Sequence, residues 1–276
     1  MDGLITLSPQ QFTRFAAFIY ERTGIRTADG KVMLLSNRIR RRLRACGIDS
    51  FDTYYELLQA DRTGAELEAF VDVITTNETH FFRTPAHFDW VAGPFLDELI
   101  AAAAAHRRGR TLRIWSAACS SGEEAYSLAI CLTEQAGRLA GWRLSVLGTD
   151  LCGEALAAAR VGAYGPRAIE AVSPERLARH FAADPAAGTW KIRPPAARLC
   201  EFRRHNLLDP MPEPPFSLIL VRNVLIYFDR DSKRAALANL VAALEPGGYL
   251  LVGTTDGASE HLSGLDRCST FTYRKP

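Results

Sequence analysis

LRIWSAAC, residues 112–119, is a short apolar run that leads into the small residues SSG at 120–122 and the acidic pair Glu123 and Glu124. A run of this length, bounded by small residues, is typical of a buried strand. Further runs follow at 143–150 (RLSVLGTD), 216–221 (FSLILV) and 248–254 (GYLLVGT), with helical stretches at 123–138, 153–160 and 231–244. Strands that alternate with helices predict an α/β domain with a mostly parallel sheet.

Upstream of this region, the apolar residues recur at helical spacing from Ser8 to about Ile100, as in Phe12, Phe15 and Ile19. Ser8 and Pro9 supply a helix start, and glycines at 24, 47 and 64 mark helix ends. This pattern predicts a small all-α N-terminal domain at 1–85, in front of an α/β domain at 86–276.

The alternation of strands and helices breaks between residues 173 and 209. A helical stretch at 173–181, SPERLARHF, leads to two segments that alternate like strands, at 190–193 and 198–202. We expect these two segments to form a β-hairpin, within a small antiparallel insertion at about 181–204.

Composition narrows the class of protein. The chain has 276 residues, of which 47% are hydrophobic, and a formal net charge of +2, which gives no argument for nucleic-acid binding. The N-terminus has no signal-peptide pattern and no window is apolar enough to span a membrane, so we expect a cytoplasmic protein without membrane insertion. The six cysteines lie far apart without a C-x-x-C pair, which favours reduced thiols and no metal site.

In a parallel sheet, ligands bind beyond the carboxyl ends of the strands, where the strand order reverses. Gly122 is the only glycine in the run at 117–124 that follows the first strand, and Glu123 and Glu124 would repel a pyrophosphate, so a dinucleotide is disfavoured. The carboxylates would instead attract a cationic ligand such as S-adenosylmethionine. The alternative for Glu124 is a capping box with Ser121.

Polar residues follow the other strands as well. Asp150 ends the second strand, where it could accept hydrogen bonds from ribose hydroxyls or cap the next helix. Asn206 could read an adenine edge, and Arg222 and Asn223 directly follow FSLILV. Each residue alone has a local explanation, and their recurrence at successive strand ends favours one shared site.

Several motifs, in this order, carry a resemblance to a known family. TTNETHFFR at 75–83, WSAACSSGEEAYSLA at 115–129, GTDL at 148–151, NLL at 206–208 and RNVLIYF at 222–228 resemble the CheR family of bacterial chemotaxis methyltransferases. The resemblance extends from about Ser8 to Tyr273. It implies a Rossmann-like S-adenosyl-L-methionine-dependent domain that forms glutamate methyl esters on the cytoplasmic domain of methyl-accepting chemotaxis receptors, for sensory adaptation, with S-adenosyl-L-homocysteine as product.

The resemblance also implies roles for individual residues. The residues implied to line the cofactor site are Asn77, Thr79, Arg83, Glu124, Asp150, Asn206, Leu207, Arg222 and Asn223. Arg83 and Tyr227 are implied to lie near the transferred methyl group and are the candidate catalytic residues. Alternatives remain: Arg83 could form a salt bridge between the domains, and Tyr227 could be a packed aromatic residue.

The stretch NRIRRRLR at 37–44 is strongly basic. We expect Arg38, Arg41 and Arg42 to dock the acidic methylation helices of a receptor. The alternative is a solvated helix face with Ile39 and Leu43 buried beneath it. Without interleaved aromatic residues, this stretch is not a nucleic-acid platform.

Three rival functions remain open at this point. They are methylation of a nucleic acid or a small molecule, methylation of a receptor-like signalling protein outside motility, and cofactor binding by a sensor or scaffold without transfer.

Overall fold

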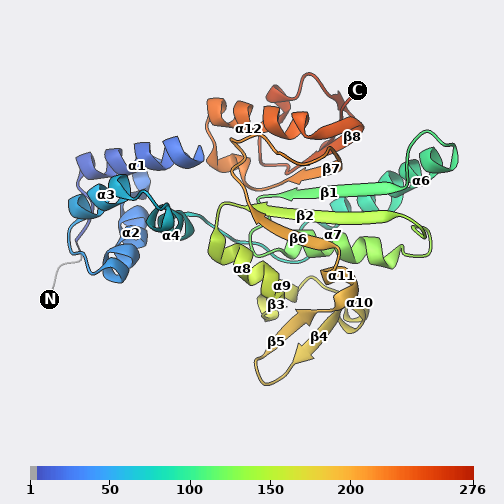
Figure 1. The fold of residues 1–276 in the computed structure, drawn as a ribbon, viewed down its shortest axis with the longest axis horizontal. Helices are drawn as coiled ribbons and strands as arrows, with labels where there is room; N and C mark the ends of the chain where they lie inside the picture. Colours follow the sequence, from blue (N-terminus) through green and yellow to red (C-terminus); the bar gives the residue numbers. More distant parts are fainter. Residues whose placement is uncertain (1–4) are drawn as a thin grey trace.

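The computed structural model describes residues 5–276, so the first four residues of the N-terminus lie outside the description. Figure 1 shows a group of N-terminal helices beside one end of a large sheet, and a small sheet below the large one. This arrangement has three parts, which we describe in chain order.

The N-terminal part consists of four helices, α1 (Pro9–Thr23), α2 (Val32–Cys46), α3 (Phe51–Ala60) and α4 (Ala65–Ile74), with a short 3₁₀ turn η1 (Asp29–Lys31) before α2. The Ser8 side chain accepts from the Gln11 amide and the Gln11 side chain accepts from the Ser8 amide, which forms a capping box at the start of α1. The helices bury Phe15, Tyr54 and Phe70 against one another. This bundle confirms the predicted all-α N-terminal part.

A single interrupted helical stretch leads to the sheet. It consists of α5 (Pro85–Trp90), a π-helical turn η2 (Val91–Phe95) that contains Pro94, and α6 (Leu96–Ala104). Phe88, Phe95 and Leu96 are buried in the main core. The stretch therefore forms part of one helical layer of the α/β domain.

The large sheet has the strand order β6-β2-β1-β7-β8-β10-β9. Its strands are β1 (Thr111–Ala117), β2 (Arg143–Asp150), β6 (Cys200–Arg204), β7 (Phe216–Val221), β8 (Leu244–Val252), β9 (Asp266–Arg267) and β10 (Thr272–Arg274). The neighbours from β6 to β8 are parallel, and β10 is antiparallel to β8. The chain moves outward from β1 to β2 and β6 and then returns to β7 and β8. The strand order therefore reverses between β1 and β7.

Helices cover both faces of this sheet. The helices α7 (Glu123–Glu134) and α8 (Gly153–Val161) pack on one face, and α12 (Arg230–Ala242) packs on the other (Figure 1). Ile114 and Leu218 belong to the first core, and their neighbours Trp115 and Ile219 belong to the second. Because successive side chains of a strand point to opposite faces, the continuous apolar runs of β1 and β7 supply both cores.

A second sheet has the strand order β3-β5-β4 and is antiparallel. It consists of β3 (Ala163–Tyr164), β4 (Phe181–Asp184) and β5 (Thr189–Ile192), with the short helices α9 (Pro166–Ile169), α10 (Pro174–His180) and α11 (Pro194–Ala197) around it. The expected pairing of 190–193 with 198–202 is wrong. β5 pairs with β4, and β6 pairs in parallel with β2, from Val146 opposite Cys200 to Asp150 opposite Arg204. The alternation of residues 198–202 indicates a strand but does not identify its partner.

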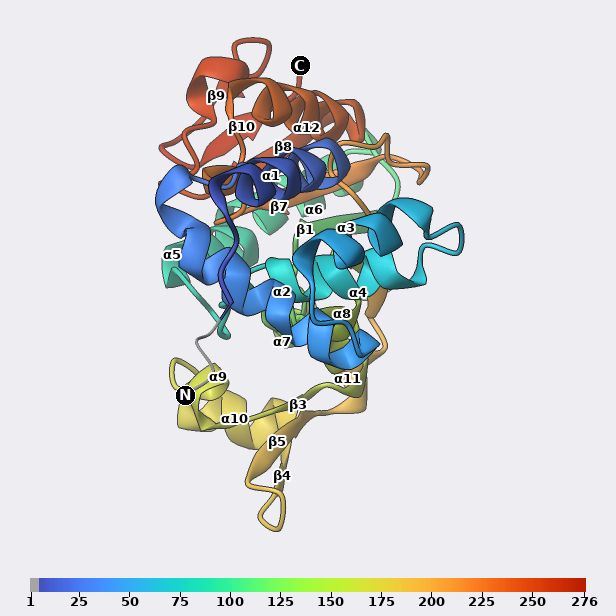
Figure 2. The same cartoon turned by 90° about the vertical axis from the view of Figure 1, so that its left-hand side faces the viewer.

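The N-terminal helices lie across the open end of the sheet (Figure 2). The helix α4 contacts α8, and the carboxylate of Asp72 accepts from the Gly153 amide at 2.6 Å. On the opposite side, Ile25 forms an antiparallel bridge with Phe228, and the Arg26 amide donates to the Tyr227 carbonyl at 2.8 Å. These two sets of contacts enclose a cleft between the helices and the sheet.

In residues 5–276, no helix is both long enough and apolar enough to cross a membrane.

Candidate active site

The cleft lies at the carboxyl ends of β1, β2 and β7, where the strand order reverses, and its outer wall comes from the N-terminal helices. This is the position that parallel α/β sheets favour for ligands. The cleft brings together most of the predicted residues, which are Arg38, Asn77, Thr79, Arg83, Glu124, Asp150, Leu207, Arg222, Asn223 and Tyr227. Residues far apart in the sequence thus meet in one place.

The loop after β1 has an unusual backbone. Ala118 and Ser120 have φ values of +61° and +52°, and Gly122, which precedes α7, has +92°. A Cβ at Gly122 would lie 2.8 Å from the Cβ of Ala159, so this position has room only for glycine. Residues other than glycine in the left-handed conformation cost conformational energy and concentrate at functional sites. The small side chains of this loop leave backbone groups accessible at the floor of the cleft.

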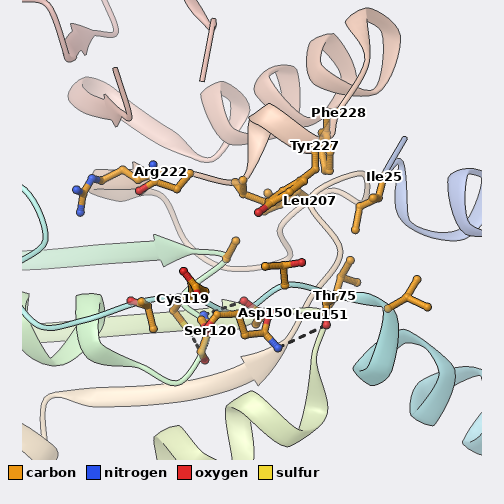
Figure 3. A pocket seen from close by; sticks show the side chains of 18 of the residues that line it. Ile25, Thr75, Cys119, Ser120, Asp150, Leu151, Leu207, Arg222, Tyr227 and Phe228 are labelled. Atoms are coloured by element: carbon orange, nitrogen blue, oxygen red, sulfur yellow. Dashed lines mark hydrogen bonds between the residues drawn. The ribbon is translucent and has the colours of Figure 1, made fainter. Parts of the chain in front are cut away.

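Asp150 fixes this loop. Its Oδ2 accepts from the Ser120 amide at 2.8 Å, and its Oδ1 accepts from the Cys152 amide at 2.9 Å. The residue is only 8% exposed, and burial raises the pKa of its carboxyl group, while the backbone hydrogen bonds lower it. Figure 3 shows Asp150 beside Ser120 and Leu151 on one side of the cleft, opposite Leu207 and Tyr227.

Glu124 does not form a capping box, so that alternative is wrong. The Ser121 hydroxyl instead donates to the carboxylate of Glu123 at 2.8 Å, and Gly122 is the N-cap of α7 without a side-chain bond. Glu124 accepts from the Ser116 hydroxyl at 2.7 Å and forms an ion pair with Arg222 at 2.9 Å. The expected attraction of a cation by both carboxylates is therefore reduced, because Glu123 is buried and Glu124 is neutralised by Arg222.

The segment that joins α4 to α5 lines the cleft with Asn77, Thr79 and Arg83. The Asn77 carbonyl accepts from the Ser120 hydroxyl at 3.1 Å, which ties this segment to the loop after β1. The Arg83 guanidinium donates to the Glu78 carbonyl at 3.2 Å, and it has no carboxylate partner within residues 5–276. The structure therefore gives no support to an interdomain salt bridge of Arg83.

The turn after β7 supplies the other side of the cleft. Asn223 has a φ of +58°, a conformation that asparagine tolerates better than most residues. Its amide donates to the buried carboxylate of Asp256 at 2.8 Å. The following 3₁₀ turn η3 (Leu225–Tyr227) places the half-buried Tyr227 side chain in the cleft. Tyr227 thus lines the cleft and also packs against the second core, and its neighbour Phe228, which is 8% exposed, lines the cleft as well.

Asn206, Arg41 and Arg42 are not among the residues that line the cleft. The Asn206 amide nitrogen donates to the Arg22 carbonyl at 3.0 Å, so this side chain joins the two domains. Arg42 binds the two carboxylate oxygens of Glu66 at 2.9 and 2.7 Å, which makes a free docking role for it inconsistent with the structure. Arg41 is exposed. The positions of basic residues along a helix do not predict which of them are paired.

Sequence reasoning missed several lining residues. They are Ile25, Arg26 and Lys31 from the connection between α1 and α2, and Thr75, Leu151 and His205 near the predicted motifs. Leu151 and His205 directly adjoin Asp150 and Asn206, so position relative to the strand ends could have identified them. Nothing in the local pattern of the α1–α2 connection indicates that it meets the sheet.

Cys119 is a buried residue of the loop after β1, and burial raises the pKa of its thiol well above the usual range. A thiol held protonated is a poor nucleophile. This agrees with the expectation of a reduced, unreactive cysteine.

Comparisons with known proteins agree with both parts of the fold. The sequence profile described as "CheR methyltransferase, all-alpha domain" matches residues 10–75, and "CheR methyltransferase, SAM binding domain" matches residues 77–273. The chain is 39% identical over 271 residues to the chemotaxis protein methyltransferase of Salmonella typhimurium, which covers 97% of this chain and 89% of that protein. It is 37% identical over 278 residues to the one of Escherichia coli, with 99% and 91% covered. Chemotaxis protein methyltransferase 1 of Pseudomonas aeruginosa is 39% identical over 260 residues, with 92% and 91% covered.

The cleft at the strand-order switch lies between the two matched regions, and together these regions account for nearly the whole described chain. An all-α domain followed by an S-adenosylmethionine-binding α/β domain is the predicted combination, and both the fold and the similarities confirm it. This chain belongs to the CheR family of S-adenosylmethionine-dependent methyltransferases.

Proposed function

We propose that this methyltransferase forms glutamate methyl esters on the cytoplasmic domain of methyl-accepting chemotaxis receptors and acts in the cytoplasm. The observation that carries the proposal is the similarity to three chemotaxis protein methyltransferases over at least 92% of the chain. The cleft supports it because Arg83, which has no carboxylate partner among the described residues, and Tyr227 line the same space as the proposed cofactor residues.

The described residues fit S-adenosylmethionine, which supplies a methyl group on a positively charged sulfur. Asp150 would offer its buried carboxylate to ribose hydroxyls, and Leu151 and Leu207, whose apolar side chains line the cleft, would contact the base. Asn77, Thr79, Glu124 and Asn223 complete the proposed cofactor set. Because the Asn206 side chain binds Arg22, its proposed contribution comes from its backbone.

The acceptor needs no general base. A glutamate side chain has a reference pKa of about 4.3, so it is already an anion at neutral pH. Catalysis then depends on holding this carboxylate in line with the methyl group, and positioning of this kind can supply about 7–11 kcal/mol. Arg83 can grip a carboxylate with two parallel hydrogen bonds, and Tyr227 can donate one more. We therefore propose Arg83 and Tyr227 as the residues that orient the acceptor.

The receptor docks on the N-terminal domain in this proposal. Arg38 lines the cleft, with its guanidinium bound to the Ile74 carbonyl and, at 2.8 Å, to the Thr76 hydroxyl. Arg41 is exposed on the same helix, as are the apolar side chains of Met33 and Leu34. A surface with positive charge and exposed apolar residues fits an acidic amphipathic helix. Charge reversal at Arg41 should weaken docking and leave cofactor affinity unchanged.

We also propose a domain division at about residue 85, inside the connection between α4 and α6, which gives domains at 1–85 and 86–276. The small antiparallel insertion, expected at 181–204, is better delimited as 163–197. This choice follows from β3, which belongs to the small sheet, and from β6, which belongs to the large one.

The experiment uses the purified protein, methyl-labelled S-adenosylmethionine and a chemoreceptor cytoplasmic fragment. Mild alkali then releases labelled methanol from methyl esters. We expect base-labile label with the wild-type protein, a loss of at least about a hundredfold in Arg83→Ala, and a smaller loss in Tyr227→Phe.

Arg110→Ala is the matched control, because Arg110 is exposed and directly precedes β1, at the end of the strand opposite the cleft. It should keep full activity. Cofactor binding without transfer to any receptor fragment would contradict the proposal and favour a sensor, and transfer only to another signalling protein would place the enzyme outside motility.

A further inference from the structure

The guanidinium of Arg222 points away from the centre of the cleft. Figure 3 shows this side chain directed away from Asp150, Leu207 and Tyr227. The side chain is 3% exposed, and its two terminal nitrogens find partners within the protein, while its Nε has no hydrogen-bond partner among the described residues.

Those partners lie on two other segments. One terminal nitrogen, Nη1, donates to the carboxylate of Glu124 at 2.9 Å. The other, Nη2, donates to the Arg83 carbonyl at 2.6 Å and to the Thr84 hydroxyl at 2.9 Å. Arg222 therefore binds the carbonyl oxygen of the Arg83–Thr84 peptide group and the side-chain hydroxyl of Thr84, and Glu124 fixes the arginine itself.

The backbone around this peptide bond is strained. Phe82 and Thr84 have φ values of +53° and +66°, and for a β-branched residue such as threonine this conformation is a genuine outlier. Such a conformation persists only where the surroundings hold it in place. The Phe82 amide donates to the Ser127 hydroxyl at 3.0 Å, which holds the first side of the turn. On the second side, Arg222 binds the Arg83 carbonyl and the Thr84 hydroxyl, and the Thr84 carbonyl accepts from the His87 amide at 3.0 Å.

We infer that Arg222 is a positioning residue that fixes the turn at 82–84 and thereby aims the Arg83 side chain at the acceptor carboxylate. This inference rests on the proposed role of Arg83 and changes the expected role of Arg222. Its guanidinium does not bind the cofactor directly, and the Glu124–Arg222 pair links the first turn of α7 to the acceptor side of the cleft.

The test is a double-mutant cycle with Arg83. Thr84→Val keeps the shape of the side chain and removes one hydrogen bond to a charged donor, which should lower kcat/KM for the receptor fragment about tenfold. Arg83→Ala leaves the carbonyl and the hydroxyl that Arg222 binds in place. In the Arg83→Ala protein, Thr84→Val should therefore lower kcat/KM less than about twofold further. Arg222→Met should show the same dependence on Arg83 with a larger loss.

Trypsin cleavage after Arg83 gives a second readout that needs no acceptor. We expect cleavage between Arg83 and Thr84 to be at least about tenfold faster in Thr84→Val and Arg222→Met, because the turn opens more often. Arg113→Met is the matched control, since Arg113 also binds a carboxylate, that of Glu213 at 2.8 Å, and a backbone carbonyl, but far from the cleft. It should show no change in cleavage at Arg83.

Additive losses in kcat/KM would overturn the inference, as would unchanged cleavage at Arg83 in both variants. These outcomes are distinct from failure of the proposed function, in which the wild-type protein transfers no methyl group to the fragment. In that case the rate of cleavage at Arg83 still decides whether Arg222 fixes the turn.

Discussion

Gly253→Ala is the substitution for which the structure gives the sharpest prediction. Gly253 follows β8 and lies against the buried carboxylate that holds the turn after β7. A Cβ at this position would lie 2.2 Å from Oδ2 of Asp256 and 3.2 Å from the Asn223 amide nitrogen. Those two atoms form the 2.8 Å hydrogen bond of the turn, so the new methyl group and the bond cannot coexist.

The size of the loss in folding stability follows from the contacts that the new methyl group disrupts. Asp256 is 0% exposed, so its carboxylate cannot swing into water. Loss of a hydrogen bond to a charged group costs about 1.5–3 kcal/mol, and overpacking of a buried site costs about 1–3 kcal/mol. We expect the free energy of unfolding to fall by at least about 3 kcal/mol. At about 2–4 °C for each kcal/mol in a chain of this size, a loss of about 3 kcal/mol lowers Tm by roughly 6–12 °C, which is the smallest fall that we expect.

The assay is urea unfolding together with calorimetric titration of S-adenosylmethionine. Because Asn223 lines the cleft, the Kd for the cofactor should rise at least about tenfold at a temperature where the variant is still folded. Gly264→Ala is the control, since a Cβ at Gly264 meets no atom within 4 Å, and it should stay within about 0.5 kcal/mol of the wild type. A Gly253→Ala protein with wild-type stability and cofactor affinity would refute the reasoning.

Three further predictions concern other parts of the molecule. Burial, and to a lesser degree the charge of Arg222, lower the pKa of His87 to about 4. Between pH 6.5 and 4 the unfolded chain binds a proton that the folded chain does not. The free energy of unfolding should therefore decrease by up to about 3 kcal/mol as the pH is lowered from 6.5 to 4. His87→Phe should reduce this decrease in urea titrations. Gly122→Ala places a Cβ against Ala159 in a left-handed backbone, so it should lower Tm and raise the cofactor Kd, and unchanged binding would show that the loop tolerates a shift. Ser8→Ala removes the capping box of α1 and should cost about 1 kcal/mol in chemical unfolding, with methyl transfer unchanged.

Much of the fold could be predicted because its causes are local. A strand buried on both faces needs a continuous apolar run, and a helix that covers a sheet needs apolar residues at helical spacing. Both patterns can be recognised in a short stretch of sequence, of about ten residues. Asp150 and Asn223 could be found for a similar reason, since a parallel sheet brings the ends of its strands to one edge. The motifs at 75–83 and 222–228 indicated the family to which the chain belongs.

The partners of side chains could not be predicted in this way. Arg222 and Glu124 are 98 residues apart, and only the pairing of β1 with β7 brings them together. The partner of β6 could not be predicted either, because its alternating residues fit either sheet. Nor could the ion pair of Arg42 with Glu66.

The sequence by itself therefore determined the α/β class, the N-terminal helices and the strand ends that carry the site, because periodicity and turn chemistry act over short distances. Only the tertiary structure decided which carboxylate neutralises Arg222, where Asn206 donates, and that the connection between α1 and α2 closes the cleft. These outcomes depend on contacts between segments that are distant in the chain, and a buried polar group binds whichever partner the packing brings within reach.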